Sequence, residues 1–70
     1  MMPLALADIG EDNLIRRVSG DEAMKKHLED MGFVAGGSVR VVSTIGGNLI
    51  VQVKSSRVAL NREMAMRILI

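Results

Sequence analysis

The stretch of sequence that decides the fold is SVRVVSTIGGNLIVQVK, residues 38–54. Apolar residues alternate with other residues on both sides of the Gly46-Gly47 pair, which is typical of two strands joined by a tight turn. A β-hairpin is therefore predicted from Ser38 to Lys54. Because side chains alternate across a strand, each arm has one apolar face. These faces consist of Val39, Val41 and Ile45 on the first arm and Leu49, Val51 and Val53 on the second.

The length of the hairpin loop determines which of these residues meet. A two-residue turn at Gly46-Gly47 would pair Val41 with Gln52 and place the two apolar sets on opposite faces. A three-residue loop that also includes Asn48 pairs Val41 with Val53 and buries both sets together. We therefore expect the three-residue loop.

A helix is predicted over residues 21–31, before the hairpin. Ser19 followed by Glu22 fits a capping box, and Asp21 is the alternative N-cap. Gly32 stands where a left-handed residue commonly ends a helix. The apolar stripe of this helix has helical spacing and consists of Met24, Leu28 and Met31.

Three further segments have the pattern of short strands: residues 14–18 (LIRRV), 58–60 (VAL) and 67–70 (RILI). The alternation in the first segment is imperfect, which indicates a bulge or an edge position. Asn61 can cap one helical turn through residues 62–65. Five short strands with one inserted helix predict a mainly β fold. We expect a small closed or nearly closed barrel that forms a single domain over residues 1–70.

The composition excludes several classes of function. The chain has no cysteine and a single histidine, His27, which rules out disulfides, thiolate zinc sites and cysteine nucleophiles. A serine nucleophile needs a base within hydrogen-bond distance, and the sole imidazole lies on the predicted helix. We therefore expect no catalytic residues and no enzyme. The longest uncharged stretch, residues 41–53, is shorter than the ~20 residues that cross a bilayer, so no direct membrane insertion is expected.

Metal binding has weak support in the sequence. His27 and Asp30 could share one helix face, with Glu29 nearby, but Ala23 one turn earlier cannot ligate. Ferrous iron favours imidazole and carboxylate ligands, usually three from the protein. The six methionines are softer ligands, and those on the helix belong to its core stripe. No metal site and no cofactor is predicted, and weak binding of Fe²⁺ or another transition metal is left open.

Arg16 and Arg17, together with Lys54 and Arg57, could form a basic patch on the barrel wall; the alternative is that these charges are scattered. An acidic protein surface would fit such a patch. Nucleic acid is not expected as a partner, because a net charge of +1 attracts phosphates weakly. In addition, the single aromatic residue, Phe33, offers no platform for base stacking.

Five blocks of the sequence stand in a distinctive order. They are a leucine-rich opening that ends in Gly10-Glu11, the strand at 14–18, a helix that closes with HLEDMGF at 27–33, the hairpin, and VALNREMA at 58–65 leading into Ile68. In this order they resemble the ferrous iron transport protein A (FeoA) family over essentially the whole chain. Two departures concern turns: the family often has proline where this chain has Ala35 before Gly36, and a proline-containing turn where this chain has GGN at 46–48. Neither departure affects catalysis, because the family has no catalytic residues to carry over.

The resemblance implies an SH3-like barrel and a small cytoplasmic accessory protein of ferrous iron uptake. The partner it implies is the cytosolic G-protein domain of a FeoB-type membrane transporter. Two alternatives stay open: a metal-sensing regulatory SH3-like domain, such as the similar C-terminal domains of metal-dependent repressors, and an RNA-binding SH3-like module. The residues that we expect to contribute to the protein–protein interaction are Arg16, Arg17, Met31 and Phe33, and Phe33 fits a core position equally well.

Overall fold

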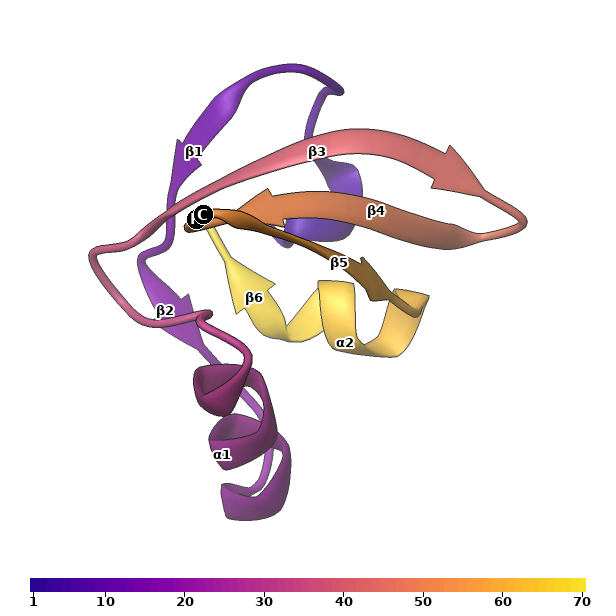
Figure 1. Ribbon diagram of the computed structural model, residues 1–70. Coiled ribbons are helices and arrows are strands. Elements are labelled where there is room, and N and C mark those ends of the chain that lie inside the picture. Colours follow the sequence, from indigo (N-terminus) through magenta and orange to yellow (C-terminus); the bar gives the residue numbers. More distant parts are fainter.

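The computed structural model describes all residues from Met1 to Ile70, and its strands form two antiparallel sheets (Figure 1). The elements are the 3₁₀ helix η1 (Leu4–Leu6), β1 (Asp12–Leu14), β2 (Arg17–Val18), α1 (Glu22–Asp30), β3 (Ser38–Ile45), β4 (Asn48–Val53), β5 (Ser56–Leu60), α2 (Arg62–Arg67) and β6 (Ile68–Leu69). One sheet has the order β1-β3-β4-β5, and the other pairs β2 with β6. The mainly β class and the inserted helix are confirmed, with six strands in place of five.

The predicted strand over residues 14–18 is wrong as a single element, because β1 and β2 divide it between the two sheets. The backbone N–H of Ile15 donates to the carbonyl of Gly37 at 2.8 Å, next to the four-stranded sheet. The N–H of Arg16 donates to the carbonyl of Leu69 at 2.8 Å, in the two-stranded sheet. The chain thus crosses from one sheet to the other between these two residues. Ile15 is fully buried at the crossing, which accounts for the imperfect alternation.

The hairpin of β3 and β4 turns on two residues, so the predicted three-residue loop is wrong. Gly46 and Gly47 have φ angles of +55° and +85°. A type I′ turn needs positive φ at both central positions, and glycine adopts it without steric cost. Ile45 pairs with Asn48 across this turn. The Gly-Gly pair therefore determines the loop length.

A β-bulge reconciles the short turn with the burial of both apolar sets. The register shifts between Val41 and Ser43, and Val41 consequently pairs with Val51. The extra residue is Val42. Without the bulge, the same turn would pair Val41 with Gln52, and the core-facing valines of β3 would point outward.

The bulge separates a buried part of the hairpin from an exposed tip. Leu49, Val51 and Val53 on β4 are buried, as predicted, and so are the first two valines of the β3 set. The third member of that set, Ile45, lies beyond the bulge and is 64% exposed. Its predicted burial is wrong because the bulge changes which face it points to.

Asp21, not Ser19, caps the N-terminal end of α1. A carboxylate oxygen of Asp21 accepts a hydrogen bond from the backbone N–H of Met24 at 2.8 Å, which satisfies one of the unpaired donors of the first turn. The Ser19 hydroxyl instead donates to the carbonyl of Arg67 at 3.2 Å. The predicted capping box is therefore wrong, and the alternative cap is confirmed.

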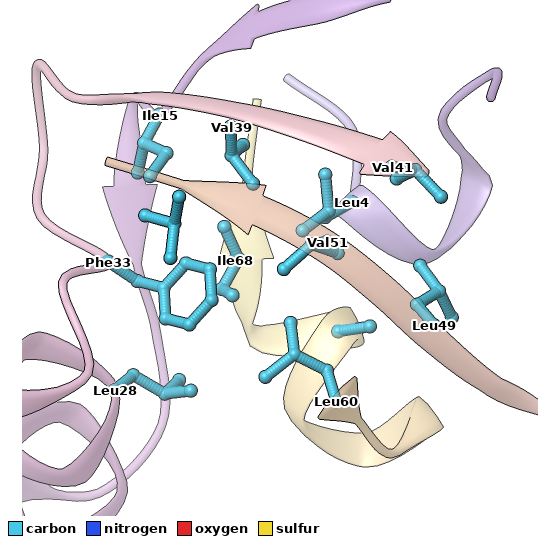
Figure 2. Close-up of a cluster of buried hydrophobic side chains, with 12 residues drawn as sticks. Leu4, Ile15, Leu28, Phe33, Val39, Val41, Leu49, Val51, Leu60 and Ile68 are labelled. Atoms are coloured by element: carbon cyan, nitrogen blue, oxygen red, sulfur yellow. The ribbon is translucent and has the colours of Figure 1, made fainter. Parts of the chain in front are cut away.

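A Schellman motif around Gly32 closes the C-terminal end of α1. The N–H of Gly32 donates to the carbonyl of Glu29 at 2.9 Å, and the N–H of Phe33 donates to the carbonyl of Leu28 at 3.0 Å. These are the two hydrogen bonds that define the motif. Gly32 has a φ of +105°, as predicted for a residue that ends the helix. The motif brings Phe33 close to Leu28, and both side chains are fully buried (Figure 2).

The core is aliphatic apart from one aromatic ring, that of Phe33 (Figure 2). Met24 and Met31, the other two members of the predicted helix stripe, pack against it while partly exposed. Both sheets, both α-helices and η1 contribute to the core. Its twelve buried residues are Leu4, Ile15, Leu28, Phe33, Val39, Val41, Leu49, Val51, Val53, Leu60, Ala65 and Ile68.

The predicted cap at Asn61 is confirmed, and it starts a longer helix than expected. The side-chain carbonyl of Asn61 accepts a hydrogen bond from the N–H of Met64 at 2.8 Å. The resulting α2 continues to Arg67 before the chain enters β6. Neither this helix nor α1 has the length and apolar character that a bilayer crossing demands.

Replacing Phe33 with alanine should lower the free energy of unfolding by about 3–5 kcal/mol, because its fully buried ring would leave a cavity in a small core. The matched control is Val34→Ala: Val34 is 37% exposed, and its truncation should cost less than about 1 kcal/mol. Urea unfolding followed by circular dichroism measures both losses. Equal losses would contradict the placement of Phe33 in the core.

Candidate interaction surface

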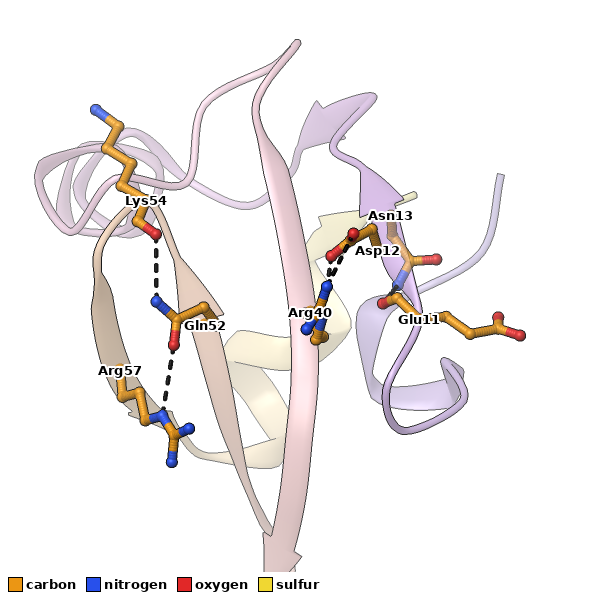
Figure 3. Close-up of polar contacts among 7 residues, drawn as sticks. All are labelled: Glu11, Asp12, Asn13, Arg40, Gln52, Lys54 and Arg57. Atoms are coloured by element: carbon orange, nitrogen blue, oxygen red, sulfur yellow. Dashed lines mark hydrogen bonds and ion pairs between the residues drawn. The ribbon is translucent and has the colours of Figure 1, made fainter.

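Four polar side chains form a line across the four-stranded sheet, one from each strand (Figure 3). The register places Asp12 of β1 opposite Arg40 of β3, which lies opposite Gln52 of β4. Gln52 in turn lies opposite Arg57 of β5. Because the valines on either side of these positions in β3 and β4 are buried, the four side chains project from the outer face. We call these four residues the polar row.

Asp12 and Arg40 form a bidentate ion pair at one end of the polar row. Arg40 Nε donates to Asp12 Oδ1 at 2.9 Å, and Arg40 Nη2 donates to Asp12 Oδ2 at 3.0 Å. These hydrogen bonds, aided by the opposite charge, lower the pKa of Asp12 from its ordinary value of 3.8 and raise the pKa of Arg40. Both side chains are largely exposed, so salt screens their attraction.

Gln52 connects the middle of the row to β5. Its Nε2 donates to the backbone carbonyl of Lys54 at 3.3 Å, and its Oε1 accepts from Arg57 Nε at 3.4 Å. The second hydrogen bond is long, and the oxygen that accepts it is uncharged. Gln52 therefore orients the Arg57 guanidinium without neutralising it.

Lys54 lies in the two-residue turn between β4 and β5 and has a φ of +53°, the only positive φ outside glycine. Its aliphatic stem passes over the C-terminal end of α1, since a Cβ placed on Gly32 would lie 3.7 Å from Lys54 Cδ. A cation at this position is favoured by the carbonyls that end the helix. The turn therefore holds a positive charge at the margin of the outer sheet face.

The outer face of the sheet has an excess of positive charge. The ion pairs of the structure are Arg40–Asp12 and Lys26–Asp30, so Lys54 and Arg57 have no acidic partner. A depression of about 300 Å³ lies on this face, and all five residues that line it are polar or charged. Such a surface suits a ligand that carries carboxylates. The lining residues are Asp12, Ser38, Arg40, Gln52 and Lys54.

The structure divides the basic patch that the sequence suggested. Arg17 lies in the two-stranded sheet and Arg57 in the four-stranded sheet. Arg16 lines a second depression, of about 440 Å³, with Met1, Met2, Asn13 and Ile70. Lys54 lines the first depression instead. The two pairs of basic residues thus belong to different surfaces.

The other two residues that we expected at an interface lie near the C-terminal end of α1. Met31, the C-cap residue, is partly exposed and can contact a partner. Phe33 is fully buried, so the structure assigns it to the core, one of the two roles that the sequence left open. Its influence on any contact is indirect, through the position of the helix end.

The helix residues considered for metal binding do not form a cluster. No group of three or more histidine, aspartate or glutamate side chains is arranged to hold a metal ion. Asp30 instead forms an exposed ion pair with Lys26, with 3.7 Å between Lys26 Nζ and Asp30 Oδ2. This pair is one of the helical contacts that sequence spacing provides.

Sequence reasoning missed the polar row. Asp12 and Arg40 are 28 positions apart in the chain, and only the register of β1 against β3 brings them together. The polar alternation in β3 and β4 gave a partial signal, because Arg40 and Gln52 stand between buried valines. Their partners on the outer strands could not be identified without the sheet order.

The FeoA domain model matches residues 2–70 of the chain. A protein of Methanocaldococcus jannaschii with the provisional name Fe(2+) transport protein A is 30% identical over 70 residues, which cover 100% of this chain and 85% of that protein.

Solved structures share the fold over nearly the whole chain. FeoA of Stenotrophomonas maltophilia has a TM-score of 0.85 and 31% identity to this chain, and 99% of this chain and 88% of that chain are covered. That protein was crystallised with zinc and is described as a prokaryotic SH3 domain protein with a suggested role as a ferrous iron transport activating factor. A manganese-dependent transcriptional repressor has a TM-score of 0.84 at 23% identity over 94% of this chain and 38% of its own. The second likeness shows the fold alone. The SH3-like barrel is therefore confirmed.

The Asp12–Arg40 ion pair should make the stability of the fold depend on pH. Because the folded-state pKa of Asp12 is lowered, the stability that the pair contributes is present above pH 3.8 and is lost as the pH falls through the depressed pKa. Arg40→Leu should return the pKa of Asp12 toward 3.8, whereas Arg57→Leu, the control, should leave it depressed. An NMR titration of the Asp12 carboxyl carbon measures this. An unchanged pKa in Arg40→Leu would contradict the pairing.

Proposed function

Because this chain belongs to the FeoA domain family, we propose that it is a cytoplasmic accessory protein of ferrous iron uptake that binds the cytosolic G-protein domain of a FeoB-type membrane transporter. The observation that carries the proposal is the family match over residues 2–70, together with a relative named for Fe(2+) transport. Iron is the cargo of the transporter in this scheme. The proposal involves no resident metal or cofactor in this chain.

The means of action in this proposal is contact with the partner. The twelve-residue core fixes a small barrel whose charged side chains all lie outside it. Such a barrel can change the activity of another protein by binding one of its conformations better than the others. SH3-like folds serve many unrelated functions, so the exposed side chains decide which partner is bound.

The contact residues that we propose are Arg16, Arg17 and Met31. Arg16 lines the depression of about 440 Å³ beside the paired chain ends, together with three apolar residues, Met1, Met2 and Ile70. Arg17 is exposed on β2. An arginine flanked by apolar surface is a common anchor in protein–protein interfaces. Acidic residues on the G-protein domain would complement both arginines.

The test measures binding of the purified chain to the purified G-protein domain of the cognate transporter by isothermal titration calorimetry. Saturable binding is expected, and Arg16→Glu/Arg17→Glu should weaken it at least about tenfold. Arg62→Glu on α2 is the control for a charge reversal elsewhere and should bind like the original chain.

Two results would count against this account. The absence of binding at concentrations up to about 1 mM would reject the G-protein domain as the partner. Unchanged affinity of the double variant would keep the partner and remove the two arginines from the interface.

A further inference from the structure

The outer edge of β5 carries backbone groups without partners. β4 lies on one side of β5, and no strand lies on the other. A two-residue turn is closed by a hydrogen-bonded pair, which here consists of Val53 and Ser56. Hydrogen-bonded and non-hydrogen-bonded pairs alternate along an antiparallel ladder, so the pairs Gln52–Arg57 and Ile50–Ala59 are not hydrogen-bonded. The N–H and C=O groups of Arg57 and Ala59 therefore point away from β4.

These edge groups have no hydrogen-bond partner within the chain. Beyond the β4–β5 ladder, no backbone or side-chain group hydrogen-bonds to the backbone of Arg57 or Ala59. Both residues are exposed, whereas Val58 between them packs against the core. The edge thus offers two donors and two acceptors in an extended conformation. That arrangement is a template for the addition of a further strand.

The charge at this edge discriminates between candidate strands. Arg57 has one long hydrogen bond to Gln52 and no carboxylate, and Lys54 adds a second uncompensated charge beside the strand. β5 contains no acidic residue. Opposite charges across an antiparallel pair stabilise it, and like charges weaken it. Pairing with β5 of a second copy is disfavoured for this reason, and an acidic strand is favoured.

We propose that the β5 edge is a docking site for an extended acidic segment of a protein partner, which adds to the sheet beside β5. The backbone of the segment pairs with Arg57 and Ala59. A carboxylate opposite Arg57 replaces Gln52 as the main partner of the guanidinium, as a charged acceptor makes the stronger hydrogen bond. The site is a property of this chain and holds whichever protein supplies the segment, so it stands or falls separately from the transporter interaction.

The experiment uses the intact chain and a blocked peptide of about ten residues that alternates threonine with glutamate, which suits a strand with one acidic face. NMR titration at low salt follows the backbone amides. Saturable shifts centred on β5 are expected, with slower hydrogen exchange at the amides of Arg57 and Ala59. A peptide that alternates threonine with lysine should not bind.

Two variants separate charge from backbone pairing. Arg57→Glu should weaken the glutamate peptide at least about tenfold, whereas Arg62→Glu should not. Ala59→Pro removes one edge donor without changing charge and should also weaken binding, because the added segment loses one backbone hydrogen bond. The fold should be retained, because the Ala59 N–H points away from β4 and the ladder to that strand does not use it. Urea unfolding of each variant verifies that the fold is retained.

The proposal is overturned if the glutamate peptide does not bind at about 1 mM, or if it binds with shifts confined to a different surface. Binding that survives Arg57→Glu unchanged overturns it as well. Tighter binding of a single-stranded oligonucleotide at the same edge would replace the acidic protein segment by nucleic acid. Concentration-dependent dimerisation through β5 in sedimentation would show that a second copy is the occupant.

Discussion

The register of the β3–β4 hairpin is the constraint on which the rest of the structure depends. The Gly46-Gly47 turn favours a loop of two residues, which by itself would place the valines of the two arms on opposite faces. The bulge at Val42 removes this conflict, since one extra residue exchanges inward and outward positions along the remainder of β3. Val41 then packs with the β4 valines in a core that has only one aromatic ring.

The same register builds the outer surface. When Val39 and Val41 point inward, Arg40 between them must point outward, opposite Gln52. The neighbouring strands then extend the line to an acidic residue on β1 and a basic residue on β5. Arg40 is paired with the carboxylate of Asp12, whereas Arg57 and Lys54 have no acidic partner. The uncompensated positive charge therefore lies at the β5 end of the sheet. Core and candidate binding surface are thus two faces of one arrangement.

Local patterns predicted the elements of this chain better than their pairing. The helix ends near Gly32, the Asn61 cap and the β4 valines follow from residues close together in sequence, and the structure agrees with each of them. The choice between Ser19 and Asp21 as N-cap could not be made from local sequence. The Ser19 hydroxyl donates a hydrogen bond to the backbone carbonyl of Arg67, which is distant in the chain, so Asp21 caps the helix.

The interaction surface could be predicted only in part, for a related reason. The basic residues were visible in the sequence, but their division between two sheets depends on the chain crossing at Ile15 and Arg16. The family resemblance supplied the fold and the role in iron transport, which the match over residues 2–70 supports. The outer edge of β5 was not predicted, because an edge is a property of the sheet order and not of any segment.

The register is tested most directly by cross-strand NOEs between Hα protons, which are strong only for the non-hydrogen-bonded pairs of an antiparallel ladder because those backbones approach most closely. The bulged two-residue hairpin predicts strong Hα–Hα NOEs between Val41 and Val51 and between Val39 and Val53. Strong Hα–Hα NOEs between Val42 and Gln52 and between Thr44 and Ile50, the non-hydrogen-bonded pairs of the alternative register, would establish the three-residue loop instead. They would contradict both the core and the polar row described for this protein.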